Sequence, residues 1–143
     1  MGKSRADEIE FESQPERGLK LLRLPGSYAI CRIEATGPVP TLPLTHKDFW
    51  SLTQTADELS LVCLEEHVRD DVRAEPGWCV LKLEGPFAFD ETGVLSSVLG
   101  PLGEAGVGIF AVSTFDTDYV LVKQDSFARA AQVLRDAGHA VHE

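Results

Sequence analysis

Two short acidic segments hold the residues best suited to chemistry. The first, Ser113-Thr-Phe-Asp-Thr-Asp118, is a polar bend between two apolar stretches. Asp116 and Asp118 are two residues apart, so in extended backbone they would share one face and could meet a cationic group of a ligand. The alternative is a solvated hairpin turn, where Ser, Thr and Asp are common. Composition alone favours the turn.

The second segment, Phe89-Asp-Glu-Thr-Gly-Val94, leads into an amphipathic helical pattern. Backbone N–H groups at a helix N-terminus favour an anion such as a carboxylate. The simpler interpretation is that Asp90 or Thr92 caps the helix. If the fold brings the two segments together, a helix N-terminus for a carboxylate and an Asp for an ammonium would form an amino-acid site. A divalent-metal cluster of the same carboxylates is a weaker alternative.

Signals for catalysis are weak, so we expect no enzyme and no cofactor. The chain has no Gly-x-Ser-x-Gly sequence. Cys31, Cys63 and Cys79 lie among apolar residues, which indicates reduced cysteines in the core. His139 and His142 are three residues apart and would point to opposite faces of a strand, which disfavours a shared metal.

Composition limits the class of protein. The chain has 143 residues, 43% of them apolar, and a formal net charge of −10, which is typical of a soluble globular protein. Its Lys and Arg residues form no patch, so nucleic acid is not an expected partner. It has no apolar run of the ~18 residues that a membrane span needs, and no apolar leader at its start. We therefore expect a cytoplasmic protein.

An internal repeat predicts the architecture. Tyr28–Glu34 matches Trp78–Glu84 in residue class at an offset of 50, and each copy follows a Pro-Gly turn signal. Asp57–Cys63 matches Thr117–Lys123 at an offset of 60. These matches predict an N-terminal unit over 15–74 and a C-terminal unit over 75–143.

The C-terminal copy carries the clearer pattern. Hydrophobic spacing and turn residues predict, in order, a strand over 78–85, a helix over 92–105, strands over 107–114 and 119–123, a helix over 125–137 and a strand over 139–142. This βαββαβ order predicts an α+β, ferredoxin-like sheet with both helices on one face.

The N-terminal copy should have the same order with shorter helices. Pro38, Pro40 and Pro43 leave room for about one helical turn near His46–Phe49, so its first helix should be degenerate. Whether the two copies exchange strands stays open at this stage.

Several strings resemble the small bacterial tandem ACT-domain proteins, which are similar to the regulatory region of aspartate kinases and to the CASTOR arginine sensor. The resemblance covers about residues 18–142 and is carried by Leu24–Ile30, Phe49–Thr53, Glu58–Val62, Phe89–Val94, Gly100–Leu102 and Ser113–Val122.

The resemblance implies a non-catalytic regulatory module that binds a small molecule, usually an amino acid, between ACT units lying side by side in a homodimer. It implies that Asp118 faces a cationic end of the ligand, with Glu91 as a second acidic partner. An unidentified protein partner would receive the signal. The alternative is a protein-interaction or dimerisation module whose pocket is vestigial. The ligand-binding residues implied by the resemblance are Phe89, Asp90, Glu91, Gly108, Ile109, Thr114, Phe115 and Asp118.

Overall fold

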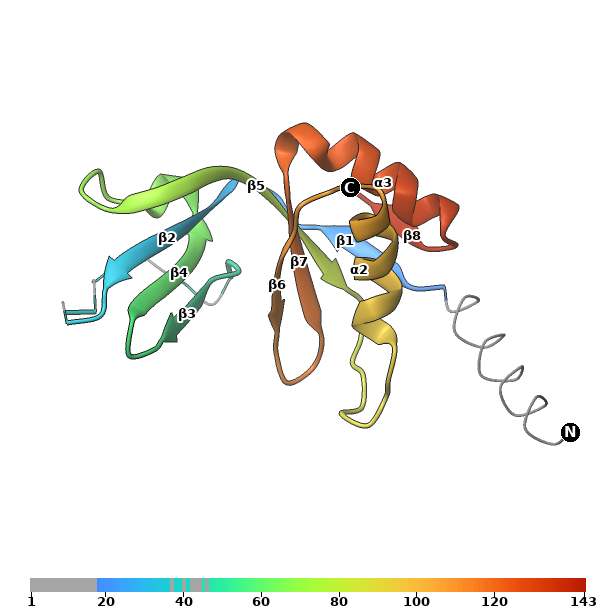
Figure 1. Ribbon diagram of the computed structural model, residues 1–143, viewed down its shortest axis with the longest axis horizontal. Helices are drawn as coiled ribbons and strands as arrows, with labels where there is room; N and C mark the ends of the chain where they lie inside the picture. The colour runs from blue at the N-terminus through green and yellow to red at the C-terminus, as the bar shows by residue number, and fades with distance from the viewer. Residues whose placement is uncertain (1–17, 37, 40, 42–44, 46) are drawn as a thin grey trace, which may run out of the picture. The chain divides into compact units, whose positions relative to one another are not determined.

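The chain folds as two compact units. The computed structural model describes residues 18–36, 38–39, 41, 45 and 47–143. The N-terminal unit is Pro25–Cys79, and the C-terminal unit combines the segment ending at Leu24 with Val80–Glu143. Strand β5 (Arg73–Leu83) runs from the first unit into the second (Figure 1).

The C-terminal unit confirms the predicted order of elements and the ferredoxin-like α+β fold. After β5 come α2 (Val94–Glu104), β6 (Phe110–Ser113), β7 (Asp118–Lys123), the short 3-10 helix η2 (Gln124–Ser126), α3 (Phe127–Asp136) and β8 (Ala140–His142). The two helices contact each other, and α3 also packs on β7 and β8.

A fifth strand completes the sheet of this unit. Strand β1 (Lys20–Arg23) lies between β5 and β8, so the order is β6-β7-β5-β1-β8. It runs antiparallel to β5 and parallel to β8, with Leu21 opposite both Leu83 and Val141. The internal repeat predicts this segment as part of the N-terminal unit, over 15–74. Four residues are too few to show a strand period, and only the pairing reveals where they belong.

Each helix of this unit buries one apolar stripe, whereas the predicted cap of the first helix is wrong. Gly93, at φ 81°, takes the N-cap position of α2, and no side chain caps it, so neither Asp90 nor Thr92 does. Asp125 lies within η2, and Ser126 is the N-cap residue of α3. The buried stripes are Val94, Val98 and Leu102 in α2, and Phe127, Ala130, Ala131 and Leu134 in α3.

His139 is a buried structural residue that links β1 to α2. The Leu19 amide donates to its Nδ1 (3.1 Å), and its Nε2 lies 3.0 Å from the Ser97 carbonyl oxygen. Because Nδ1 accepts, the neutral ring carries its proton on Nε2 and donates it to Ser97. Both ring nitrogens are therefore used within the protein.

The N-terminal unit is a sheet without an α-helix among its described residues. It contains β2 (Tyr28–Glu34), β3 (Ser51–Gln54), β4 (Glu58–Leu64), the 3-10 helix η1 (Glu65–His67) and the first part of β5, in the order β3-β4-β2-β5. The described residues between β2 and β3 form neither a helix nor a strand, in line with the degenerate first helix expected from the prolines. His46 lies outside the described residues.

One face of this sheet holds a small apolar cluster that includes two cysteines. The cluster comprises Ala29, Cys31, Leu61 and Cys63. All three cysteines of the chain are buried and none is in a disulfide, as predicted. A hydrogen bond between the Cys31 and Cys63 thiols lowers the pKa of Cys31 and raises that of Cys63, and burial raises the pKa of Cys63 further.

Glu65 links the two Pro-Gly dipeptides, of which Pro76-Gly77 lies within strand β5 and not in the turn that the sequence predicted. Its Oε2 accepts hydrogen bonds from the Ser27 hydroxyl and from the Gly77 amide, both at 2.6 Å. Its own amide donates to the Ser27 carbonyl (2.9 Å). One carboxylate thereby fixes the chain just before β2 and within β5.

The substitution Glu65→Gln is expected to lower the free energy of unfolding by about 1 kcal/mol, because both hydrogen bonds lose their charged acceptor. Urea unfolding followed by circular dichroism measures it. Glu66→Gln is the matched control, since its carboxylate is exposed. Equal stability of the two variants would show that the Glu65 contacts contribute little.

Candidate functional site

The C-terminal unit contains a cavity of about 430 Å³. It lies where the loop before α2 meets the turn between β6 and β7, and both segments extend in the same direction in Figure 1. Its lining residues are Phe87, Ala88, Phe89, Glu91, Gly93, Val94, Leu95, Ser96 and Ser113–Asp118. The two acidic segments singled out in the sequence therefore meet at one cavity.

The turn between β6 and β7 is held by its own threonines. The Thr114 amide and hydroxyl both donate to the Thr117 carbonyl (2.8 and 3.0 Å). The buried Thr117 hydroxyl donates to the Leu83 carbonyl of β5 (2.6 Å). These bonds fix how the turn presents Phe115 and Asp116, and Thr117 anchors it to the central part of the sheet.

The loop before α2 is attached to the same turn. The Phe87 amide donates to the Asp116 carbonyl (2.9 Å). A Cβ atom on Gly85 would lie only 3.0 Å from that carbonyl oxygen, so the two backbones approach as closely as glycine permits. The two walls of the cavity therefore form one connected structure.

Two aromatic rings lie at this connection. Phe89 from the loop and Phe115 from the turn pack edge to face, with ring centroids 4.8 Å apart. Their exposed fractions are 78% and 77%, which is unusual for phenylalanine. Both rings line the cavity and offer an apolar surface to a ligand or to another protein.

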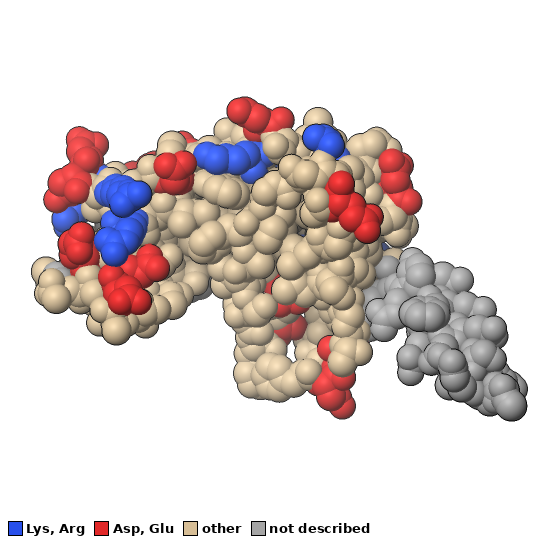
Figure 2. Space-filling model, viewed as in Figure 1, with Lys and Arg blue, Asp and Glu red and all other residues tan. Residues whose placement is uncertain are grey.

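The polar lining of the cavity is acidic. Asp118 Oδ1 accepts from the Ser113 hydroxyl (2.6 Å), and Glu91 Oε1 accepts from the Ala88 amide (3.1 Å), so both carboxylates are held in place. Asp116 is the third acidic residue, and no Lys or Arg lines the cavity. In Figure 2 this end of the C-terminal unit shows red and tan atoms but no blue ones.

The N-terminus of α2 supplies hydrogen-bond donors to the same cavity. Gly93, Val94, Leu95 and Ser96 line it, and no side chain caps the helix. The first N–H groups of a helix have no partner within the helix and favour an anion. The cavity therefore combines donors for an anionic group with acceptors for a cationic one.

The structure brings together most, but not all, of the residues implied by the resemblance. Phe89, Glu91, Thr114, Phe115 and Asp118 line the cavity, whereas Asp90, Gly108 and Ile109 do not. Ile109, just before β6, is 36% exposed. The sequence did not predict that Gly93–Ser96 line the cavity. They do so because the helix begins after Gly93, which turns its first N–H groups toward the loop.

The described part of the chain shows neither a metal site nor a membrane-spanning helix. No group of three or more His, Cys, Asp or Glu side chains there is arranged to hold a metal ion. No helix in the described residues is long and apolar enough to cross a membrane.

Comparison with known proteins places the chain in a family. Residues 73–136 match a model described as the ACT domain, and residues 26–71 match a model described as an N-terminal domain. The crystal structure of protein Atu0741 from Agobacterium tumefaciens is 45% identical, with a TM-score of 0.82, and the match covers 89% of this chain and 98% of that one. The chain therefore belongs to the same family as the Agobacterium protein and has an ACT-like ferredoxin fold.

Two further matches are a curated sensor protein and the solved structure of an enzyme. The human cytosolic arginine sensor for mTORC1 subunit 1 is 34% identical over 59 residues, which are 41% of this chain and 18% of the sensor. The chain thus spans less than a fifth of the curated relatives that it matches. Aspartate kinase of Clostridium acetobutylicum shares the fold at 14% identity and a TM-score of 0.59, covering 79% of this chain and 33% of the kinase.

Proposed function

We propose that this protein is a non-catalytic regulatory ACT protein that binds an amino acid in the cavity of its C-terminal unit. The observation that carries the proposal is the pairing of an uncapped helix N-terminus with fixed carboxylates in one cavity. A free amino acid has both an anionic and a cationic group, so it can use both sets of partners.

The acidic lining favours an amino acid with an extra positive charge. Its α-carboxylate would bind at the first turn of α2, and Asp118, with Glu91 and Asp116 nearby, would face the cationic groups. The Phe89 and Phe115 rings add aromatic faces, which attract cations. Arginine, the ligand in the name of the human relative, is the first candidate to test.

The regulatory mechanism in this proposal is linkage to a homodimer. The ligand would lie where two C-terminal units meet side by side, and would stabilise that arrangement over others. A hundredfold excess over Kd would add about 2.7 kcal/mol to stability. The output would pass to a separate protein partner in the cytoplasm, and neither a nucleic acid nor a membrane would take part.

A dimerisation or interaction module with a vestigial pocket is the second candidate. The exposed Phe89 and Phe115 rings favour it, because two adjacent exposed phenylalanines commonly mark a protein contact. In that case the cavity would be a by-product of the fold and no amino acid would bind.

A thermal-shift screen of the twenty amino acids tests the proposal. We expect one or two of them, with arginine first, to raise the melting temperature of the wild-type protein by a few degrees, and Asp118→Asn to abolish the shift. Asp57→Asn is the matched control, because Asp57 lies in the corresponding β3–β4 turn, outside the cavity. Absence of any shift would favour the interaction module.

A further inference from the structure

One side of the sheet in the C-terminal unit gathers basic side chains around an exposed leucine. Leu22 of β1 lies opposite Lys82 on β5 and opposite His142 on β8. Residues directly opposite each other point to the same side of a sheet, and so does Lys20, two residues before Leu22. The buried leucine of this strand, Leu21, points to the other side. Lys20, Leu22, Lys82 and His142 therefore form one surface, which we call the β1 patch.

The β1 patch is open and carries positive charge. Leu22 is 44% exposed, and Lys20 and His142 are exposed as well. No ion pair within the described residues uses the side chain of Lys20, Lys82 or His142. The same register places Glu84 opposite Lys20, so this surface carries two lysines against one glutamate. In a chain with a net charge of −10, such a patch favours an acidic partner.

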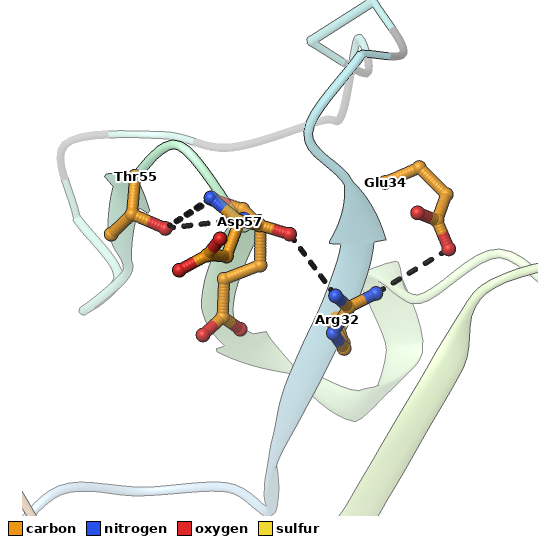
Figure 3. A network of polar contacts seen from close by, with 5 residues as sticks. Arg32, Glu34, Thr55 and Asp57 are labelled. Atoms are coloured by element: carbon orange, nitrogen blue, oxygen red, sulfur yellow. Dashed lines mark hydrogen bonds and ion pairs between the residues drawn. The ribbon is translucent and has the colours of Figure 1, made fainter.

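Cations of the N-terminal unit, in contrast, are bound by groups of that unit. Arg32 donates to the Asp57 carbonyl (3.1 Å) and pairs with Glu34 (3.4 Å), as Figure 3 shows. Arg69 pairs with Asp71 (3.1 Å). The lysines of the β1 patch have no ion-pair partner of this kind among the described residues, so their charge is available to a further acidic group.

The start of the chain contains a stretch of complementary composition. Asp7-Glu-Ile-Glu-Phe-Glu12 has four acidic and two apolar residues and no basic one. Seven residues, 13–19, connect it to Lys20, the first residue of β1. Fully extended, seven residues span about 25 Å, whereas three neighbouring strands lie within about 10 Å of one another. The stretch can therefore reach the β1 patch, and its attachment gives it an effective concentration of about a millimolar there.

We propose that the acidic stretch Asp7–Glu12 binds to the β1 patch of its own chain. Its carboxylates would lie near Lys20 and Lys82, and its apolar side chains would cover Leu22. Bound there, the stretch closes the patch to other acidic partners. Its displacement would open a second binding surface, made of residues that do not line the amino-acid cavity.

Paramagnetic broadening of NMR signals tests this inference on the full chain without added amino acid. A nitroxide is attached at Ala6→Cys, which leaves the acidic stretch intact, and the three native cysteines are buried and should not react. We expect the ¹⁵N amide signals of Leu22, Lys82 and His142 to lose most of their intensity in dilute salt. They should regain it in about 1 M salt, where the Debye length is about 3 Å.

An exchange of charges between the two partners gives the sharpest comparison. Lys20→Glu with Lys82→Glu should restore the signals. Glu8→Lys with Glu10→Lys should do the same, and it keeps the inference testable if the first variant does not fold, because it leaves the described residues unchanged. Combining both pairs should bring the broadening back. Lys47→Glu reverses the charge of an exposed lysine outside the patch, so it should keep the wild-type broadening.

Three results would overturn the inference. The first is a wild-type spectrum in which the patch signals stay sharp, and the second is equal broadening in every charge variant. The third comes from mixing nitroxide-labelled chains with ¹⁵N chains that carry no nitroxide, because broadening in that mixture would place the contact between two copies. No amino acid is present in these samples, so the outcome does not depend on the proposed function.

Discussion

Leu21→Ala is expected to lower the free energy of unfolding by about 2–5 kcal/mol, the range for a fully buried leucine. Leu21 is buried between β5 and β8, opposite Leu83 on one side and Val141 on the other. The substitution removes apolar contacts on both sides and leaves a cavity in the middle of the sheet. Urea unfolding followed by circular dichroism would measure the loss.

The neighbouring leucine provides the control. Leu22 belongs to the same strand but is largely exposed, so Leu22→Ala should cost less than about 1 kcal/mol. Similar losses in the two variants would contradict the insertion of β1 between β5 and β8, because that insertion is what buries one leucine and exposes the other.

Thr117→Val is expected to cost about 1–3 kcal/mol of stability and to weaken amino-acid binding as well. Valine matches threonine in shape but cannot donate to the Leu83 carbonyl, which would stay buried without its 2.6 Å hydrogen bond. The turn that carries Phe115 and Asp118 would lose its attachment to β5. Chemical unfolding measures the first effect, and calorimetry with the amino acid that gives the largest thermal shift measures the second.

Thr117→Ser separates the hydrogen bond from the shape of the side chain. Serine keeps the hydroxyl and loses one methyl group, so binding should return to near the wild-type value. If the valine variant binds as well as the wild type does, then Thr117 does not position the site. If the serine variant binds as poorly as the valine variant, the site depends on the methyl packing as well as on the hydroxyl.

The sequence predicted the C-terminal unit well because its signals are local. Helical spacing identified α2 and α3, and Gly138, with φ 98°, follows the end of α3. The caps could not be predicted in the same way. Asp90 and Asp125 are good capping residues by type, but the backbone enters α2 through the left-handed Gly93 and enters α3 through a 3-10 turn.

The sequence alone did not predict which strands pair when they are far apart in the chain. Nothing local in Lys20–Arg23 distinguishes a strand that pairs with β5 and β8 from one that stays with β2. The offset of 60 predicted for the second pair of repeat segments was also wrong by one residue. Thr55 and Thr114 make the same bond to the carbonyl three residues on, and they are 59 residues apart rather than 60. Buried triplets in β4 and β7 align at that spacing too, because the turns set the register.

The candidate site was only partly predictable for the same reason. The acidic turn and the loop before α2 were visible as segments, and they do share a cavity. Their connection through the Phe87 amide and Gly85 depends on two backbones meeting closely, which residue types alone do not encode. A resemblance to a family does not decide which residues line the cavity in this chain. Asp90 was predicted to bind the ligand, but only its neighbours Phe89 and Glu91 line the cavity.

The central claim is that an amino acid binds between the start of α2 and the β6–β7 turn. Amide NMR spectra of the ¹⁵N-labelled protein, recorded during titration with the best amino acid from the thermal screen, test it most directly. The account predicts that the largest shift changes fall on Val94–Ser96 and Ser113–Asp118, and that Asp118→Asn removes them. Changes centred in the N-terminal unit, or no changes with any of the twenty amino acids, would contradict it.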